Sequence, residues 1–125
     1  VEKLAALRNA VQHIAVGQGP EETTQHLLLS FIDEFSEMHL RVLIFADAPK
    51  LSAGISVGGL GHVLEENIPV LRGQRGLYDQ LWKDLYLRGL INTESLHVMM
   101  SGTGLSQSRT TELGRALIQL ITEPQ

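Results

Sequence analysis

The stretch 73–121 constrains the fold of this 125-residue chain more than any other part of its sequence. Within it, apolar residues recur at the i, i+4 and i+8 positions that share one face of an α-helix. They are Leu77, Leu81 and Leu85, with Tyr78, Trp82 and Tyr86 beside them. We therefore expect a helix over 74–88 that buries this stripe. Gly89 then supplies the left-handed residue that ends many helices.

A hairpin pattern and a closing helix follow in the same stretch. Residues 95–100 carry apolar side chains at every second position, which is the period of a β-strand, and 101–104 has the turn sequence Ser-Gly-Thr-Gly. The pattern predicts a β-hairpin with its turn at 101–104. Thr110 or Thr111 then offers the side-chain oxygen that caps a last helix. The apolar stripe of that helix is Leu113, Leu117, Leu120 and Ile121.

The N-terminal segment predicts a separate amphipathic helix over 1–16. Its apolar stripe, with spacings of three, four and three residues, is Leu4, Leu7, Val11 and Ile14. So narrow a stripe suits a coiled-coil seam, although two heptads are too short to specify one. The sequence therefore leaves two roles open for this stripe. It could pack within the chain, or it could contact a second copy or another protein.

Two further helices are predicted in the first half of the chain. Pro20 suits the first position of a helix, where its missing N–H would be unpaired in any residue. The apolar residues up to Phe35 give this helix a broad buried stripe. Ser36 has the side chain of an N-cap and opens a third helix through Asp47 that is apolar on nearly every side. We expect this third helix at the centre of the fold.

The segments LWKDLYLRGLIN and TTELGRALIQLI, on either side of the predicted hairpin, resemble winged helix-turn-helix domains. In that superfamily a recognition helix ends in a Gly-Leu-Ile turn, and the wing leads into Thr-x-x-Gly-Arg-x-Leu. The resemblance covers about 36–121 and implies a mainly α (α+β) fold. It implies a winged-helix-like domain over 36–125 with a small β-hairpin wing, after a two-helix extension over 1–35 that packs on the core or mediates self-association. The helix 74–88 would be the recognition helix.

The resemblance makes duplex DNA one expected partner, with a role in transcription regulation. The side chains that would meet base edges or phosphates are Gln74, Arg75, Gln80, Lys83 and Arg109. The range 67–111 has five basic and three acidic residues, whereas the rest of the chain has five basic and eleven acidic ones. However, Asp79 and Asp84 share the helix face that would approach the phosphates and oppose their binding.

The alternative is a non-enzymatic protein-interaction or oligomerisation domain of a larger bacterial protein. Winged helices also serve as plain interaction scaffolds, and the stripe from Leu4 to Ile14 would make the contact. A homodimer and a foreign protein are both compatible with it. The sequence leaves this function and DNA binding open.

An enzyme is the least supported class. None of the five histidines has a second histidine at the spacing that surrounds a metal ion, and no Gly-x-Ser-x-Gly nucleophile motif occurs. We therefore expect no enzymatic activity and no cofactor or metal. The absence of cysteine fits a cytoplasmic location, and no apolar run reaches the ~20 residues needed for membrane insertion. A chain that begins at Val1 is expected to be a fragment.

Overall fold

Helix α3 (Glu37–Asp47) lies at the centre of the molecule and is buried on most of its surface. Its buried side chains are Leu40, Val42, Leu43, Phe45 and Ala46. Because these residues point in several directions around the helix, other helices must cover it on more than one side. The central position expected from the sequence is confirmed. The structure is a computed structural model that describes residues 2–51, 57–97 and 99–123.

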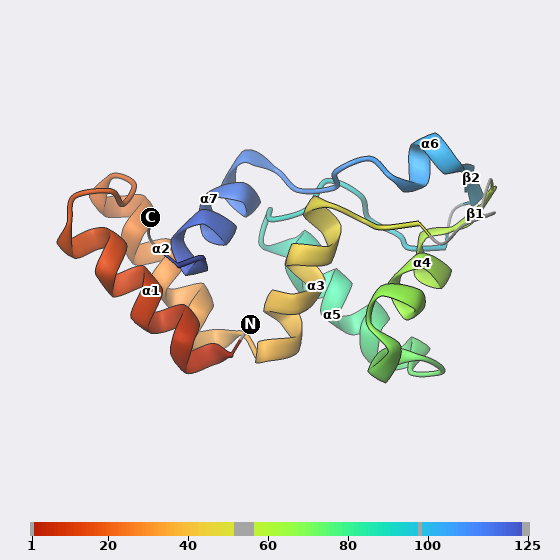
Figure 1. Ribbon diagram of the computed structural model, residues 1–125, viewed down its shortest axis with the longest axis horizontal. Coiled ribbons are helices and arrows are strands. Elements are labelled where there is room, and N and C mark those ends of the chain that lie inside the picture. The colour runs from red at the N-terminus through yellow and green to blue at the C-terminus, as the bar shows by residue number, and fades with distance from the viewer. Residues whose placement is uncertain (1, 52–56, 98, 124–125) are drawn as a thin grey trace.

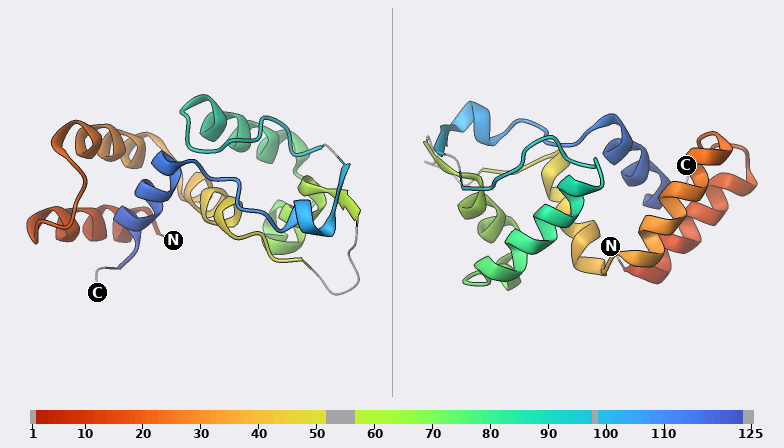
Figure 2. Two further views of the ribbon diagram at one scale, coloured as in Figure 1. Left: turned by 90° about the horizontal axis from the view of Figure 1, so that it is seen from above. Right: turned by 180° about the vertical axis from the view of Figure 1, so that it is seen from behind.

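The other elements form two ends around α3 (Figure 1). One end contains α1 (Lys3–Ala15), α2 (Glu22–Glu34) and α7 (Glu112–Ile121). The other end contains β1 (Val57–Gly59), α4 (Leu60–Asn67), η1 (Pro69–Leu71), α5 (Arg75–Leu87), β2 (Met99–Ser101) and α6 (Gly102–Leu105). Figure 2 shows α1 and α2 as an antiparallel pair, with α7 packed against α1.

Side-chain caps set where several helices begin. Ser36 forms a capping box with His39, as its side chain accepts from the His39 N–H at 3.2 Å while the Ser36 N–H donates to His39 Nδ1 at 3.1 Å. Thr111 caps α7, so both expected caps are confirmed. The cap of α2 differs from the prediction. Glu21 accepts from two backbone N–H groups, and the helix begins after it instead of at Pro20.

The predicted β-hairpin wing is wrong, and with it the winged-helix-like α+β fold class. Residues 102–105, which include most of the expected turn, form the short helix α6. Strand β2 pairs antiparallel with β1, which lies about forty residues earlier in the chain, instead of with a return strand after the turn. A single antiparallel bridge, from Ile91 to Thr110, joins the segments that flank the expected hairpin. The fold is therefore helical, with one pair of three-residue strands in the described part of the chain.

A close contact explains the Thr-x-x-Gly segment at the start of α7. Thr111 Oγ1 accepts from the Gly114 N–H at 3.0 Å and donates to the Gly89 carbonyl oxygen at 2.6 Å. A Cβ atom at Gly114 would overlap the carbonyl oxygen of Leu90. The segment thus lets α7 sit directly against the turn that follows α5. Gly89 has φ of 74° there, which confirms the predicted left-handed residue.

Candidate interaction surface

Helix α1 buries its small residues and exposes its large ones. Its buried positions are Ala6, Asn9 and Ala10, and the Asn9 side chain donates to the Ile121 carbonyl oxygen at 2.8 Å. Alanine lets α1 approach α7 and α2 closely, and the asparagine bond ties α1 to the end of α7. The predicted apolar stripe therefore points elsewhere.

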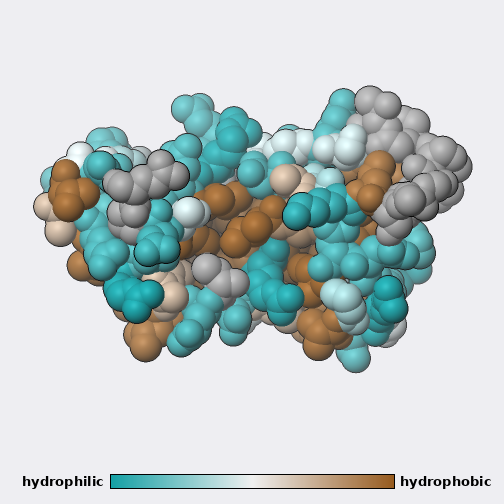
Figure 3. Space-filling model, in the orientation of Figure 1, coloured by the Kyte–Doolittle hydropathy of each residue, from teal (hydrophilic) through white to brown (hydrophobic). Residues whose placement is uncertain are grey.

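The exposed side of α1 carries three of the four stripe residues. Leu4 is 72% exposed, Leu7 is 43% exposed and Val11 is 54% exposed, while Ile14 is partly buried against the core. Leaving such side chains in water is unfavourable by about 1.5–3 kcal/mol each relative to full burial. Figure 3 shows hydrophobic residues reaching the surface at the end of the molecule that α1 and α2 form. Packing within the chain was one of the two roles that the sequence left open for this stripe. It explains the position of Ile14 only.

A groove lies beside this stripe, between α1 and α2. It encloses about 360 Å³ and is lined by Lys3, Leu4, Leu7, Leu29, Ile32 and Asp33. The Lys3 ammonium donates to the backbone carbonyl oxygen of Asp33 at 2.6 Å, which joins the start of α1 to the end of α2. We call the three residues Leu4, Leu7 and Val11 together with this groove the α1–α2 face.

The sequence analysis missed the contribution of α2 to this face. Leu29 and Asp33 carry no distinctive pattern, and Ile32 belongs to the stripe that was expected to be buried. The one available signal is the run Leu27 to Leu29, because three consecutive leucines cannot all lie on a single buried stripe. Leu28 is fully buried, whereas Leu29 is half-buried and Leu27 is exposed.

Four of the five DNA-contact candidates lie on or just before α5 and are exposed. Gln74 is the residue before the helix, and Arg75, Gln80 and Lys83 follow along it. Two of them contact acidic residues of the same helix. Arg75 Nε lies 3.8 Å from Asp79 Oδ2, and the Gln80 side-chain amide donates to Asp84 Oδ1 at 2.7 Å. A DNA strand would have to compete with these contacts.

The two aspartates of α5 also bond to histidines from other parts of the chain. Asp79 Oδ1 lies 2.6 Å from His97 Nε2, and Asp84 Oδ2 lies 2.8 Å from His39 Nε2. Burial raises the pKa of Asp84, but the hydrogen bonds from His39 and Gln80 lower it further, so the net shift is downward. The histidine and the aspartate are 18 residues apart in the first pair and 45 residues apart in the second. A local sequence pattern therefore could not predict either pair.

Arg109, the fifth DNA-contact candidate, is half-buried and held within the chain. Its guanidinium bonds to the Gly104 carbonyl oxygen and donates to Thr93 Oγ1 at 3.3 Å. Its backbone N–H donates to the Ala46 carbonyl oxygen at 2.7 Å. These contacts connect the segment after α6 to α3 and to the segment after α5.

Ser36, His39 and Asp84 form a hydrogen-bonded chain of the residue types used in nucleophilic catalysis. Ser36 Oγ lies 2.8 Å from His39 Nδ1, while His39 Nε2 faces Asp84. Ser36 and His39 are also the two halves of the α3 capping box, and the His39 ring stacks on Phe35 at 4.9 Å. The chain of bonds therefore fits a role in starting α3 and joining it to α5.

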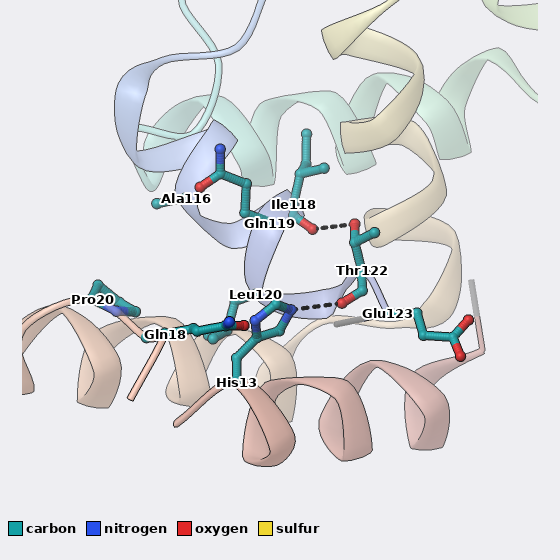
Figure 4. A pocket seen from close by; sticks show the side chains of 10 residues that line it. His13, Gln18, Pro20, Ala116, Ile118, Gln119, Leu120, Thr122 and Glu123 are labelled. Atoms are coloured by element: carbon teal, nitrogen blue, oxygen red, sulfur yellow. Dashed lines mark hydrogen bonds between the residues drawn. The ribbon is translucent and has the colours of Figure 1, made fainter. Parts of the chain in front are cut away.

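A second cavity lies between the α1–α2 turn and α7 (Figure 4). It has a volume of about 580 Å³ and mixed polar and apolar walls. Several of its polar groups already bond within the chain. His13 Nε2 lies 2.9 Å from the Thr122 carbonyl oxygen, and the Thr122 hydroxyl donates to the Ile118 carbonyl oxygen at 2.6 Å. The cavity offers no cluster of charges that would select a ligand.

Two kinds of site do not occur in the part of the chain that the structure describes. No three or more histidine, aspartate or glutamate side chains there are grouped so that they could hold a metal ion. None of its helices combines the length and apolar character required to cross a bilayer.

The chain matches no family model, no curated protein and no solved structure. The family resemblance therefore rests on the two short segments around residues 81–92 and 110–121 alone.

Proposed function

We propose that the chain is a non-enzymatic oligomerisation module that associates with a second copy through the α1–α2 face. The observation that carries the proposal is the exposure of Leu4, Leu7 and Val11 on a helix whose opposite side is already buried. Contiguous exposed apolar residues beside a groove are typical of contact surfaces. Identical surfaces that meet across a two-fold axis are the commonest arrangement in homo-oligomers.

The size of the face sets the expected affinity. Helix α1 has 13 residues and is therefore about 20 Å long, and two packed helices are about 20 Å wide. Two such faces would bury about 800 Å² in total, which is below the ~1,200 Å² of stable interfaces and in the range of weak, transient ones. We therefore expect a dimer with a micromolar or weaker dissociation constant.

Sedimentation equilibrium tests the proposal. From about 1 μM to about 1 mM, the wild-type chain should change from monomer to dimer. Leu4→Gln should weaken the dimer about a hundredfold, because each of the two copies loses burial worth about 1.4 kcal/mol. Leu87→Gln is the matched control, since Leu87 is also a leucine that is largely exposed, but it lies on α5. A wild-type chain that stays monomeric, or an equal effect of both variants, would refute the proposal.

DNA binding through α5 has less support. It requires Arg75 and Lys83 to approach phosphates from a helix that also presents Asp79 and Asp84. The expected wing, which would have added a second contact to the duplex, is replaced by α6. Arg109 is engaged in bonds that hold the fold.

A further inference from the structure

The groove between α1 and α2 has two walls of opposite charge. The basic wall consists of Lys3, Leu4 and Leu7 from α1, and the acidic wall consists of Leu29, Ile32 and Asp33 from α2. Each wall is thus a pair of apolar side chains with one charged residue. Lys3 and Asp33 lie at the same end of the helix pair, because the Lys3 ammonium bonds to the Asp33 carbonyl oxygen.

We propose that the second copy binds with its basic wall on the acidic wall of the first, around a two-fold axis that runs along the groove. This inference rests on the proposed self-association and specifies its geometry. A two-fold axis parallel to the helices places α1 of one copy over α2 of the other. Since α1 and α2 are antiparallel within a copy, every neighbouring pair in the resulting four-helix bundle is antiparallel.

The contacts in this arrangement are complementary in polarity and charge. Leu4 and Leu7 of one copy meet the half-buried Leu29 of the other, above Ile32, which is buried and forms the floor of the groove. Lys3 of each copy meets Asp33 of the other, and the two-fold axis repeats this pair. The dimer therefore contains two pairs of opposite charge, both at one end of an apolar seam.

The other two-fold arrangement is electrostatically worse. An axis perpendicular to the helices would place α1 over an antiparallel α1, so that Lys3 and Asp33 of one copy would lie at the opposite end from those of the other copy. Neither of the two pairs of Lys3 with Asp33 could then form, and their contribution to selecting the arrangement would be lost. Charge therefore favours α1 over α2.

A mixture of two charge-reversed variants tests this geometry. In a Lys3→Glu homodimer, both contacts between position 3 of one copy and position 33 of the other join two acidic side chains. In an Asp33→Lys homodimer, both contacts join two basic side chains. Each homodimer should dissociate about three- to tenfold more readily than the wild type at low salt. In the heterodimer, each contact between positions 3 and 33 again joins opposite charges. Native mass spectrometry of an equimolar mixture should therefore show clearly more heterodimer than the statistical proportion of about half.

The matched control replaces Lys3→Glu by Arg8→Glu. Arg8 lies on α1 about 140° around the helix from Lys3 and does not line the groove. Mixing Arg8→Glu with Asp33→Lys should give no heterodimer preference. Circular dichroism should confirm that all variants keep their helices.

The outcomes separate this inference from the function on which it rests. If the wild type dimerises and Leu4→Gln disrupts the dimer, but the Lys3→Glu and Asp33→Lys mixture forms only the statistical proportion of heterodimer, the geometry is wrong and the proposed function stands. If the wild type is monomeric up to about 1 mM, both are wrong.

Discussion

Glu65 shows how one side chain can hold a turn in place. It accepts a hydrogen bond from the Tyr78 hydroxyl at 2.6 Å and another from the Gly73 N–H at 3.2 Å. These bonds lower the pKa of Glu65, and the Tyr78 bond contributes most. Burial, followed by the bond to Glu65, raises the pKa of Tyr78 to about 12. The ionised carboxylate thus links α4 to the start of α5.

Tyr78→Phe should destabilise the protein in a pH-dependent way. Because the pKa of Glu65 is lower in the folded chain than in the unfolded one, its bonds stabilise the fold above the unfolded value of about 4.3. That contribution is lost as the pH falls through the folded pKa. Urea unfolding should therefore show the largest difference between Tyr78→Phe and the wild type near neutrality, and a smaller one in acid. A difference that is constant with pH would contradict this role.

Two glycines that both lie in helices should respond in opposite ways to alanine. Gly114→Ala should cost about 3 kcal/mol of stability, because the new methyl group would overlap the Leu90 carbonyl oxygen. Gly76→Ala, in the first turn of α5, meets nothing within 4 Å and should stabilise by about 0.5–1 kcal/mol. Urea unfolding at one protein concentration measures both. Equal effects would mean that α7 does not approach Leu90 as closely as described.

At the scale of elements, α1 illustrates that an apolar stripe does not identify the buried side of a helix. Leu4, Leu7 and Val11 have the spacing of a packed seam, yet the buried residues of α1 are Ala6, Asn9 and Ala10. Small residues allow two helices to approach closely, and the larger stripe remains for another surface.

The same substitution at two leucines checks which side of α1 is covered. At concentrations below dimerisation, Leu4→Ala should change the free energy of unfolding by less than about 0.5 kcal/mol, since Leu4 is exposed. Leu28→Ala in α2 should cost about 2–5 kcal/mol, because Leu28 is fully buried. If Leu4→Ala is as costly as Leu28→Ala, the face of α1 is covered within a single chain.

Helix α5 is the second element in which pattern and burial differ. Leu81, Leu85 and Trp82 are buried as predicted, and the Trp82 indole donates to the Thr93 carbonyl oxygen at 2.7 Å. Leu77 belongs to the same i, i+4 series but is 50% exposed. Leu77 thus continues the helical spacing of the stripe, but its side chain is half in solvent near the start of α5.

At the scale of the whole molecule, charge favours the proposed self-association over DNA binding. The chain has a net charge of −4, and the exposed arginine and glutamine of α5 contact its own aspartates. Counterion release, which drives DNA binding, requires an excess of cations at the surface.

We therefore expect no salt-dependent binding to a mixed-sequence duplex. Fluorescence anisotropy at about 50 mM salt should show no saturable binding, and Arg75→Gln with Lys83→Gln should change nothing. Binding that weakens steeply with salt, and that this double variant reduces, would favour the DNA-binding alternative instead.

The sequence alone determined the features that depend on neighbouring residues. Ser36 and Thr111 cap helices because their side chains reach N–H groups three residues later. Gly89 ends α5 because it adopts a left-handed conformation without a steric cost. The central burial of α3 follows from a helix that is apolar on nearly every side.

Only the tertiary structure decided the pairing and covering of these elements. β1 and β2 are too short to encode their partner, so the pairing of segments about forty residues apart replaced the local hairpin. The bonds of Asp79 and Asp84 to histidines depend on distant segments meeting beside α5. The exposed face of α1 likewise arises because α7 and α2 cover the side of α1 that carries its alanines. The spacing of apolar residues in α1 does not predict which side is covered.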